Sequence, residues 1–145
     1  MLNKNDKAYE MYKYINPIEH AKTDEQIEKY KVEPYVVEAD IYSEGNIAGR
    51  GGWTWYTGSS AWMYELQIKY ILGINIEEGI MSFTPCIPKE WNEFSVDFKW
   101  KDALYKINYK RMGKNKIHIN DNSQLIEENK IKLKDGGEYI INVEY

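Results

Sequence analysis

The sequence is poor in cysteine and contains no long apolar run. Its one cysteine, Cys86, excludes a disulfide within the chain and is typical of a reducing compartment. The segment TPCIP around Cys86 holds no second metal-ligating residue, which favours a buried structural thiol over a catalytic nucleophile or a metal ligand. No segment approaches the roughly 20 apolar residues that cross a bilayer, and MLNKNDKAYE has no apolar core of a signal peptide. A soluble protein of the cytoplasm is therefore expected.

An excess of basic charge is also absent. The chain has 19 Lys and Arg against 23 Asp and Glu, which gives a formal net charge of −4. A surface that follows a nucleic-acid backbone needs more basic residues than acidic ones. Nucleic acid is therefore not the expected main partner, although a local anion site stays possible.

Aromatic residues, by contrast, are abundant. The 145 residues include 13 tyrosines and 5 tryptophans, and the aromatic share is 14%. Large rings fill protein cores, and flat rings also stack on the faces of sugars. Composition alone leaves both interpretations open.

The first part of the chain has the apolar spacing of short helices. Apolar residues three and four apart predict a helix over Asn5–Tyr14, which Pro17 should end. A turn of helix is expected from Thr23, where Thr23 and Gln26 fit a capping box. In VEPYVVEADIY both extended chain and a short helix stay open, and Pro34 slightly favours a helix after it.

A longer helix is predicted from Ser59 to Leu72. It is apolar on almost every side, which is typical of a buried helix, and Gly73 stands where a helix often ends.

The apolar period then changes from 3.6 to 2, beyond a hinge expected near residues 79–92. Short alternating stretches follow, separated by turn residues: FSVDFKW, ALYKINYKR, KIHIN, KIKL and EYIINVEY. They predict an antiparallel β module, either a sandwich or part of one. The expected fold class is therefore α+β, with helices in residues 1–78 and the β module in residues 79–145.

The stretch GRGGWTWYTGSSAW, Gly49–Trp62, combines flexible glycines with rigid tryptophans. A helix begins after Thr57-Gly58, and its free N–H groups and dipole favour an anion. Ser59 adds a hydroxyl, and Arg50 can either contact phosphate or brace the glycine loop. The alternative is that Thr57 or Ser59 merely caps the helix, and spacing alone favours the cap.

Three motifs, in this order, resemble the C-terminal part of glycoside hydrolase family 94: YKVEPYVVEADIYS, GRGGWTWYTGSSAWMYELQIKYILGI and FTPCIPKEW. That family holds inverting phosphorylases of β-linked gluco-oligosaccharides and the C-terminal part of cyclic β-1,2-glucan synthases. WTWYTGS after GRGG is more similar to the synthase-like branch. The resemblance implies the last helices of an (α/α)₆ barrel, followed by a β-sandwich-like C-terminal module.

The resemblance also implies a site and a reaction of the glycosyltransferase type. Thr57 and Gly58 match the residues that contact phosphate, which is the co-substrate, and no cofactor or metal is implied. Phosphate attacks the anomeric carbon while a carboxylic acid protonates the leaving oxygen, so that α-glucose 1-phosphate forms.

The catalytic aspartate of the family, and the arginine and histidine that hold phosphate, lie upstream of the matched part. His20, His118 and Asp40 do not match them, so no catalytic residue is assigned and the isolated chain is expected to be inactive. Members that cleave disaccharides commonly place a glutamine near Val37 to Asp40, and this chain has none there. The sugar specificity therefore stays open.

Other residues are candidates for substrate binding, each with a structural alternative. Glu33 can bind a sugar hydroxyl or anchor its loop. Trp53 and Trp55 can stack on sugar, although packing against the β module is favoured for one of them. Glu38 and Asp40 suggest paired carboxylates, but a solvated or loop-bracing role is favoured.

Three functions remain in competition. The first is the C-terminal part of a β-glucoside phosphorylase, with β-linked gluco-oligosaccharide and phosphate as its ligands. The second is a non-catalytic carbohydrate-binding or interaction module. The third and weakest is a small enzyme that uses Glu33, Asp40 and the Thr57 site.

Self-association is expected in the first case. Helices separated from a barrel expose apolar faces, and such faces usually mark interfaces. We expect a homodimer with contacts from Met11, Trp62, Met63, Leu66 and Tyr70.

Overall fold

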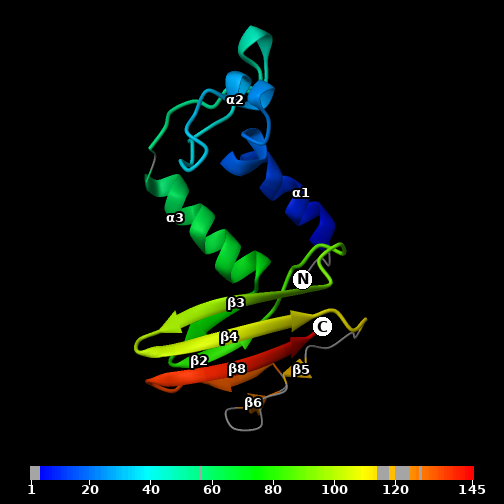
Figure 1. Ribbon diagram of the computed structural model, residues 1–145, viewed down its shortest axis with the longest axis vertical. Coiled ribbons are helices and arrows are strands. Elements are labelled where there is room, and N and C mark those ends of the chain that lie inside the picture. The colour runs from blue at the N-terminus through cyan, green and yellow to red at the C-terminus, as the bar shows by residue number, and fades with distance from the viewer. Residues whose placement is uncertain (1–3, 56, 114–117, 120–124, 128) are drawn as a thin grey trace. The chain divides into compact units, whose positions relative to one another are not determined.

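The computed structural model describes residues 4–55, 57–113, 118–119, 125–127 and 129–145 (Figure 1). The chain divides into two compact units. The helical unit is Asp6–Gln67, and the β unit is Ile68–Tyr145 together with the described residues up to Asn5. The domain boundary expected between residues 78 and 79 stays a prediction.

The helical unit begins much as its apolar spacing predicts. Helix α1 spans Asn5–Ile15, and the 3₁₀ helix η1, Pro17–His20, follows it directly. Asn16 caps η1, because its side-chain oxygen accepts a hydrogen bond from the Ile18 N–H at 3.2 Å. Pro17 thus ends α1, as expected, and also starts the next turn.

Helix α2, Asp24–Tyr30, has the predicted N-terminal cap at Thr23. The Thr23 hydroxyl accepts a hydrogen bond from the Gln26 N–H at 3.2 Å. The Gln26 side chain reaches back to the Lys22 N–H at 3.1 Å, one residue before the donor that a standard capping box uses.

The segment after Pro34 begins with a turn and continues without a helix, so the slightly favoured helix is wrong. Residues 39–42 pair with residues 50–53 through backbone hydrogen bonds. The Ala39 N–H donates to the Trp53 carbonyl at 3.0 Å, and the Gly52 N–H donates to the Asp40 carbonyl at 2.8 Å. These bonds satisfy the backbone without a helix, while Val32 and Val36 pack with Tyr30 in a small core.

The predicted long helix begins slightly earlier than expected and changes its form. Helix α3 spans Thr57–Glu65, and the π-helix η3 continues over Leu66–Ile71. Gly73 follows with a φ of +70°, as expected of a residue after a helix. None of the described helices is long and apolar enough to cross a membrane.

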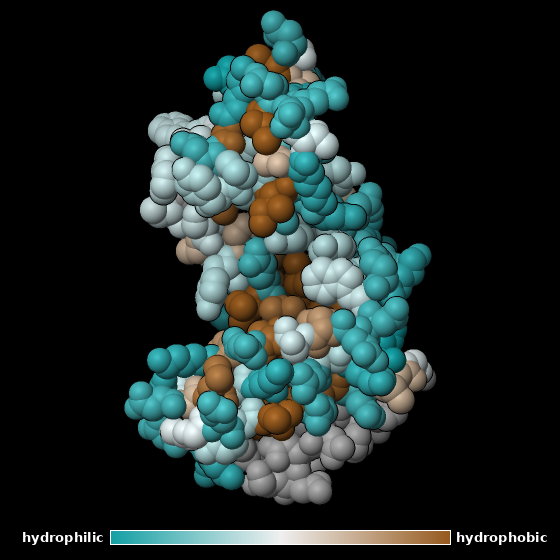
Figure 2. All heavy atoms as spheres, viewed as in Figure 1, coloured by the Kyte–Doolittle hydropathy of each residue, from teal (hydrophilic) through white to brown (hydrophobic). Residues whose placement is uncertain are grey.

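The expectation that this helix is buried on almost every side is wrong. Met63 is the buried residue of α3, whereas the Trp62 side chain is 71% exposed. Figure 2 shows apolar side chains at the surface among polar ones. Of the residues expected in a dimer contact, Met63 is therefore not available on the surface, while Met11, Trp62 and Tyr70 are exposed.

The β unit contains two four-stranded sheets. The first has the order β1-β2-β7-β6, with the strands Ile74–Glu77, Ile80–Phe83, Lys130–Lys132 and Leu125–Glu127. The second has the order β3-β4-β8-β5, with the strands Glu93–Trp100, Ala103–Lys110, Gly137–Glu144 and His118–Ile119. Figure 1 shows strands of the first sheet behind the second.

Two expectations about these sheets need correction. The β4–β8 pair is parallel, so the module is not purely antiparallel. A parallel pair needs a long connection, and the chain between β4 and β8 supplies it by passing through the first sheet. The supposed hinge at residues 79–92 holds β2, which forms a hairpin with β1 across Glu78 and Gly79. Both turn residues have positive φ, as a two-residue hairpin turn requires.

One core lies between the sheets. Its buried residues come from both, among them Met81 and Phe83 of β2 and Tyr105, Ile107 and Tyr109 of β4. Cys86, expected to be buried, is only half-buried, and its thiol donates to the Asn5 side-chain oxygen at 3.4 Å. Burial raises the pKa of this thiol, which suits a structural role.

Candidate functional site

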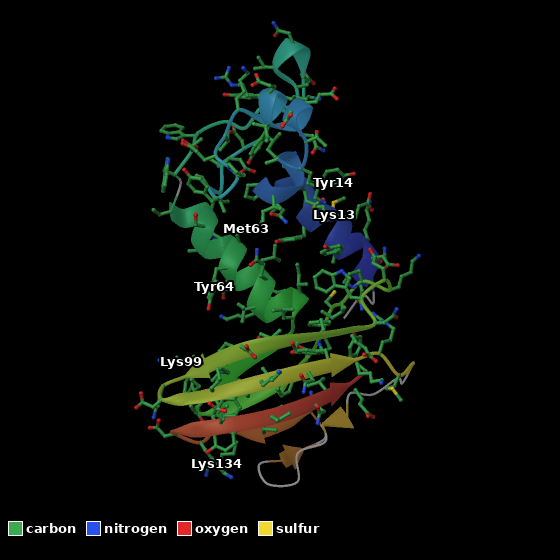
Figure 3. The ribbon with its side chains drawn as sticks, in the orientation of Figure 1. Lys13, Tyr14, Met63, Tyr64, Lys99 and Lys134 are labelled. Carbon is green, nitrogen blue, oxygen red and sulfur yellow. The ribbon has the colours of Figure 1, made fainter. Side chains whose placement is uncertain are left out.

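A pocket of about 810 Å³ lies within the helical unit. Its walls come from the end of α1, from residues 37–41 and from α3. Figure 3 labels one lining residue on each helix, Tyr14 on α1 and Met63 on α3. Because aromatic and aliphatic side chains form most of the lining, a few polar groups in the wall decide which ligand fits.

The N-terminus of α3 forms part of this wall. Gly58 and Ser59 line the pocket, and Thr57 is exposed at the first residue of the helix. Backbone N–H groups in the first turn of a helix have no partners within the helix and lie at its positive end. This part of the wall therefore favours a negatively charged or hydrogen-bond-accepting group.

Two glycines of the predicted loop serve packing. A side chain at Gly51 would collide with Val32, and one at Gly52 would collide with the Asp40 carboxylate. Both glycines are buried. They allow residues 50–53 to lie close against residues 39–42, which positions that segment in the pocket wall.

Arg50 and Glu33 are exposed, and neither is among the residues that line the pocket. The Arg50 carbonyl accepts from the Tyr42 N–H, and its own N–H donates to the Ile47 carbonyl, both at 3.0 Å. The Glu33 carbonyl accepts from the Val36 N–H at 3.0 Å and closes a turn. The backbone of each residue therefore braces its loop, and their roles toward substrate remain predictions.

Trp53 and Trp55 are also outside the pocket wall and are strongly exposed, at 78% and 66%. Trp55 has a φ of +60°, which is unusual for a bulky residue. Its ring meets the exposed Tyr35 ring edge to face, with 6.3 Å between the ring centroids. These rings offer stacking surfaces to an external ligand.

The sequence interpretation undervalued Glu38. Glu38 is only 5% exposed and lines the pocket together with Asp40. Of the two expected roles, solvated or loop-bracing, the solvated one is therefore wrong for Glu38. The buried Tyr30 hydroxyl donates a hydrogen bond to the Glu38 carboxylate. Burial, and then this carboxylate, raise the pKa of Tyr30, so the hydroxyl keeps its proton and remains a donor.

A signal for Glu38 was present in the sequence. Val36 and Glu38 are two residues apart and both buried, as on one face of an extended strand. The preference for a helix after Pro34 hid this relation. Asp40 continues the same spacing but is exposed.

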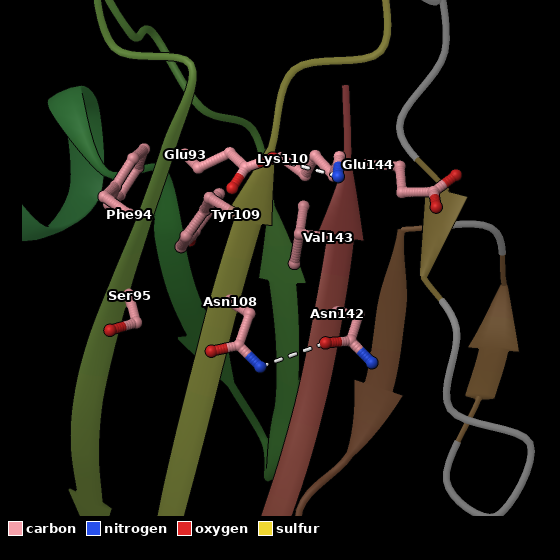
Figure 4. A pocket seen from close by; sticks show the side chains of 9 residues that line it. All are labelled: Glu93, Phe94, Ser95, Asn108, Tyr109, Lys110, Asn142, Val143 and Glu144. Carbon is pink, nitrogen blue, oxygen red and sulfur yellow. Dashed lines mark hydrogen bonds and ion pairs between the residues drawn. The ribbon is translucent and has the colours of Figure 1, made fainter.

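A second hollow, of about 560 Å³, lies on the β unit beside strands β3, β4 and β8 (Figure 4). Four of its polar side chains pair with one another: Asn108 donates to Asn142 at 3.0 Å, and Lys110 pairs with Glu93 at 2.9 Å. Within the part of the chain that the structure describes, no three His, Cys, Asp or Glu residues gather as metal ligands. The pocket of the helical unit is therefore the candidate site.

Comparison with known proteins gives two family matches. Residues 1–73 match the model of the glycosyl hydrolase 94 superfamily, catalytic domain. Residues 74–123 match that of the glycosyl hydrolase family 65, C-terminal domain. The second match covers part of the two-sheet unit and agrees with a sandwich-like module after the helices.

Individual relatives agree with the first match. The cyclic beta-(1,2)-glucan synthase NdvB of Rhizobium meliloti (strain 1021) is 41% identical over 109 residues, which are 75% of this chain and 4% of that protein. The N,N'-diacetylchitobiose phosphorylase of Vibrio proteolyticus is 35% identical over 107 residues, 73% of this chain and 13% of that protein. The 3-O-beta-D-glucopyranosyl-beta-D-glucuronide phosphorylase of Paenibacillus borealis is 37% identical over 51 residues, 35% of this chain and 7% of that protein.

The chain thus spans a small part of the curated relatives it matches, at most 13% of the length of these three. The first motif and nearly all of the second lie within residues 1–73, whereas FTPCIPKEW lies within residues 74–123. The α+β fold class is confirmed. This chain belongs to the glycosyl hydrolase 94 superfamily.

Proposed function

We propose that this chain forms part of the phosphate and sugar site of an inverting β-glucoside phosphorylase. The reaction converts a β-linked gluco-oligosaccharide and phosphate into α-glucose 1-phosphate and a shortened sugar. The observation that supports this most strongly is the family match over residues 1–73, which contain Gly58 and Ser59 in the pocket wall. Four of the relatives are phosphorylases by name, and two of them are described above.

In this proposal the first turn of α3 receives phosphate. Thr57 contributes its hydroxyl and N–H, and Gly58 contributes an N–H that no side chain shields. The positive end of the helix dipole favours the incoming anion. Phosphate is itself the nucleophile, so this part of the site needs no carboxylate as a base.

The rest of the catalytic machinery lies outside these residues in our proposal. The helices of this chain are the last ones of an (α/α)₆ barrel, and the general acid belongs to the preceding barrel helices. General acid–base catalysis contributes about 10²–10⁴-fold, and positioning of the reactants contributes more. The chain alone is therefore inactive.

The test is an assay for α-glucose 1-phosphate with inorganic phosphate and β-1,2-, β-1,3- or β-1,4-linked glucose oligosaccharides. It compares the 145-residue chain with a longer polypeptide, in which the same chain is joined to the region encoded upstream of it. We expect product only from the longer polypeptide, and we expect Thr57→Ala to reduce its formation. Absence of phosphorolysis in a folded longer polypeptide with every linkage would overturn the proposal, as would turnover by the chain alone.

The exposed aromatic rings favour a second candidate, a non-catalytic carbohydrate-binding module. Tyr35, Trp53 and Trp55 are all more than half exposed, and such rings bind sugar faces without chemistry. Glucan binding that Trp53→Ala and Trp55→Ala abolish, without phosphorolysis by the longer polypeptide, would favour this alternative.

A further inference from the structure

We propose that the hollow on the β unit is a saccharide-binding surface, in which Ser95, Asn108 and Asn142 bind the hydroxyls of a neutral, β-linked gluco-oligosaccharide. The hollow shares no lining residue with the pocket of the helical unit. The choice of a glucan rests on the proposed function, whereas the surface itself is argued from the β unit alone.

The three side chains form a polar row across three neighbouring strands. Ser95 of β3 lies opposite Asn108 of β4, and Asn108 lies beside Asn142 of β8 in the parallel pair. Figure 4 shows the three side chains at one level of the sheet. Because neighbouring strands lie about 4.8 Å apart, the row spans about 10 Å. The volume of the hollow, about 560 Å³, is within the range of about 300–1,000 Å³ that is usual for small-ligand sites.

The two asparagines occupy positions that strands seldom give to this residue. Asparagine is depleted in β-strands, and β4 and β8 are the central strands of their sheet. Asn108 and Asn142 both lie inside their strands and not in a turn, where asparagine has a local role. A residue that contradicts the local preference often marks a functional site. We therefore looked for hydrogen-bonding groups that this pair offers to a ligand.

The amide pair leaves such groups unused. The Asn108 Nδ2 donates to the Asn142 Oδ1 at 3.0 Å, which uses one donor group and one acceptor. Within the described part of the chain, the Asn108 Oδ1, the Asn142 NH₂ group and the Ser95 hydroxyl have no hydrogen-bond partner. The polar row thus presents an acceptor, two N–H donors and a hydroxyl that can donate and accept.

The charges beside the polar row disfavour an ionic ligand. Lys110 lies between Glu93 and Glu144 at the next level of the sheet, and it pairs with Glu93 at 2.9 Å. The Glu93 carboxylate, and then the charge of Glu144, raise the pKa of Lys110, so both acids act on this cation. An anion would meet two carboxylates, and a cation would meet an ammonium group already in place. Neutral hydroxyls, which both donate and accept, fit the polar row, and a saccharide carries several of them.

The experiment titrates the intact 145-residue chain with β-1,2-, β-1,3- and β-1,4-linked glucose disaccharides and tetrasaccharides. NMR follows the side-chain NH₂ signals of Asn108 and Asn142, with the NH₂ signal of Asn75 in the other sheet as a reference. The Gly58 amide signal reports on the pocket of the helical unit in the same spectra. We expect at least one sugar to shift the signals of Asn108 and Asn142 and to leave that of Asn75 unchanged.

Three variants separate ligand binding from a structural role. We expect Asn142→Ala to weaken binding at this surface about tenfold, read from the Ser95 backbone amide, because two donors are lost. Ser95→Ala, at an exposed residue, should weaken it about fivefold, read from the Asn142 amide. The matched control is Ile140→Ala, two residues from Asn142 on the same face of β8 but outside the hollow, which should leave the affinity unchanged.

Two results would overturn the inference. One is a spectrum in which sugars shift only Gly58, or shift no signal with any linkage. The other is wild-type affinity in folded Asn142→Ala and Ser95→Ala, because the asparagines would then serve only the pairing of β4 with β8. If Asn142→Ala does not fold, the affinity of Ser95→Ala decides. Phosphorolysis by the longer polypeptide tests the proposed function separately, since it can fail while this surface binds sugar and can occur while the surface binds none.

Discussion

Tyr109 should make the β unit unstable at high pH. Its side chain is 1% exposed, and its hydroxyl donates to the Leu72 carbonyl at 3.0 Å. Its ring also stacks on Phe94, with centroids 4.6 Å apart and an interplanar angle of 7°. Burial raises the pKa of Tyr109 far above that of an exposed tyrosine.

The direction of the pH effect follows from the proton balance. In the unfolded chain Tyr109 loses its proton near pH 10, whereas in the folded β unit it keeps the proton to a higher pH. The contribution of Tyr109 to stability is therefore complete below pH 10. Above pH 10 it falls by about 1.4 kcal/mol per pH unit, which amounts to about 2 kcal/mol at pH 11.5.

The assay is urea unfolding between pH 8 and pH 11.5, followed by the NMR amide signals of strand β4 in wild type and Tyr109→Phe. At pH 8 the variant should be less stable by about 1 kcal/mol, because it lacks the hydrogen bond to Leu72. Groups that do not interact with Tyr109 titrate in both proteins and cancel in the difference. The two stability curves should therefore cross at about pH 10.6, and above that pH the variant should be the more stable protein. Curves that stay parallel would refute the reasoning.

Three further predictions concern the loop, the anion site and assembly. Gly51→Ala should lower the stability of the helical unit by about 1–3 kcal/mol in thermal unfolding, because the added carbon collides with Val32. Gly52→Ala should lower the stability less, because the Asp40 carboxylate that the added carbon meets can rotate away. Thr57→Ala should weaken phosphate binding about tenfold in an NMR titration of the Gly58 amide, with Thr54→Ala as the matched control, and equal affinities would contradict the site. Sedimentation should show a dimer that the substitution Trp62→Glu dissociates, and its interface should bury more than about 1,200 Å². A well-folded monomer at tens of micromolar would contradict the predicted dimer.

The longer strands were predictable because each alternates between a more buried and a more exposed face. In β4 the buried residues Tyr105 and Ile107 alternate with the exposed residues Leu104 and Lys106, so the period is visible in the sequence. Strands β1 and β2 have four residues each, too few to establish a period, and their Glu-Gly turn is a weaker signal than Asn-Gly. The parallel pairing of β4 and β8 depends on partners distant in the chain, which local patterns do not encode.

The candidate site was predictable only in part. The start of a helix after a glycine-rich loop indicated Gly58 and Ser59, and the structure places both in the pocket wall. It does not place Thr57 there, nor the other predicted binding residues Arg50, Glu33, Trp53 and Trp55. The Glu38 carboxylate depends on a hydrogen bond from Tyr30, eight residues earlier, and on an extended segment whose apolar residues also fit a helix. The burial of this carboxylate can be recognised only when the tertiary packing is known.

The charges in the pocket wall separate two kinds of ligand. At one part of the wall the first turn of α3 presents N–H groups and a positive dipole end, and at another Glu38 and Asp40 present carboxylates. An anion is attracted by the first and repelled by the second, whereas a neutral ring rich in hydroxyls can donate to the second without repulsion. A phosphorolytic site must hold phosphate and sugar together and in a fixed order. Under the proposed function, the same polarity would disfavour the reverse arrangement, in which phosphate occupies the place of the sugar.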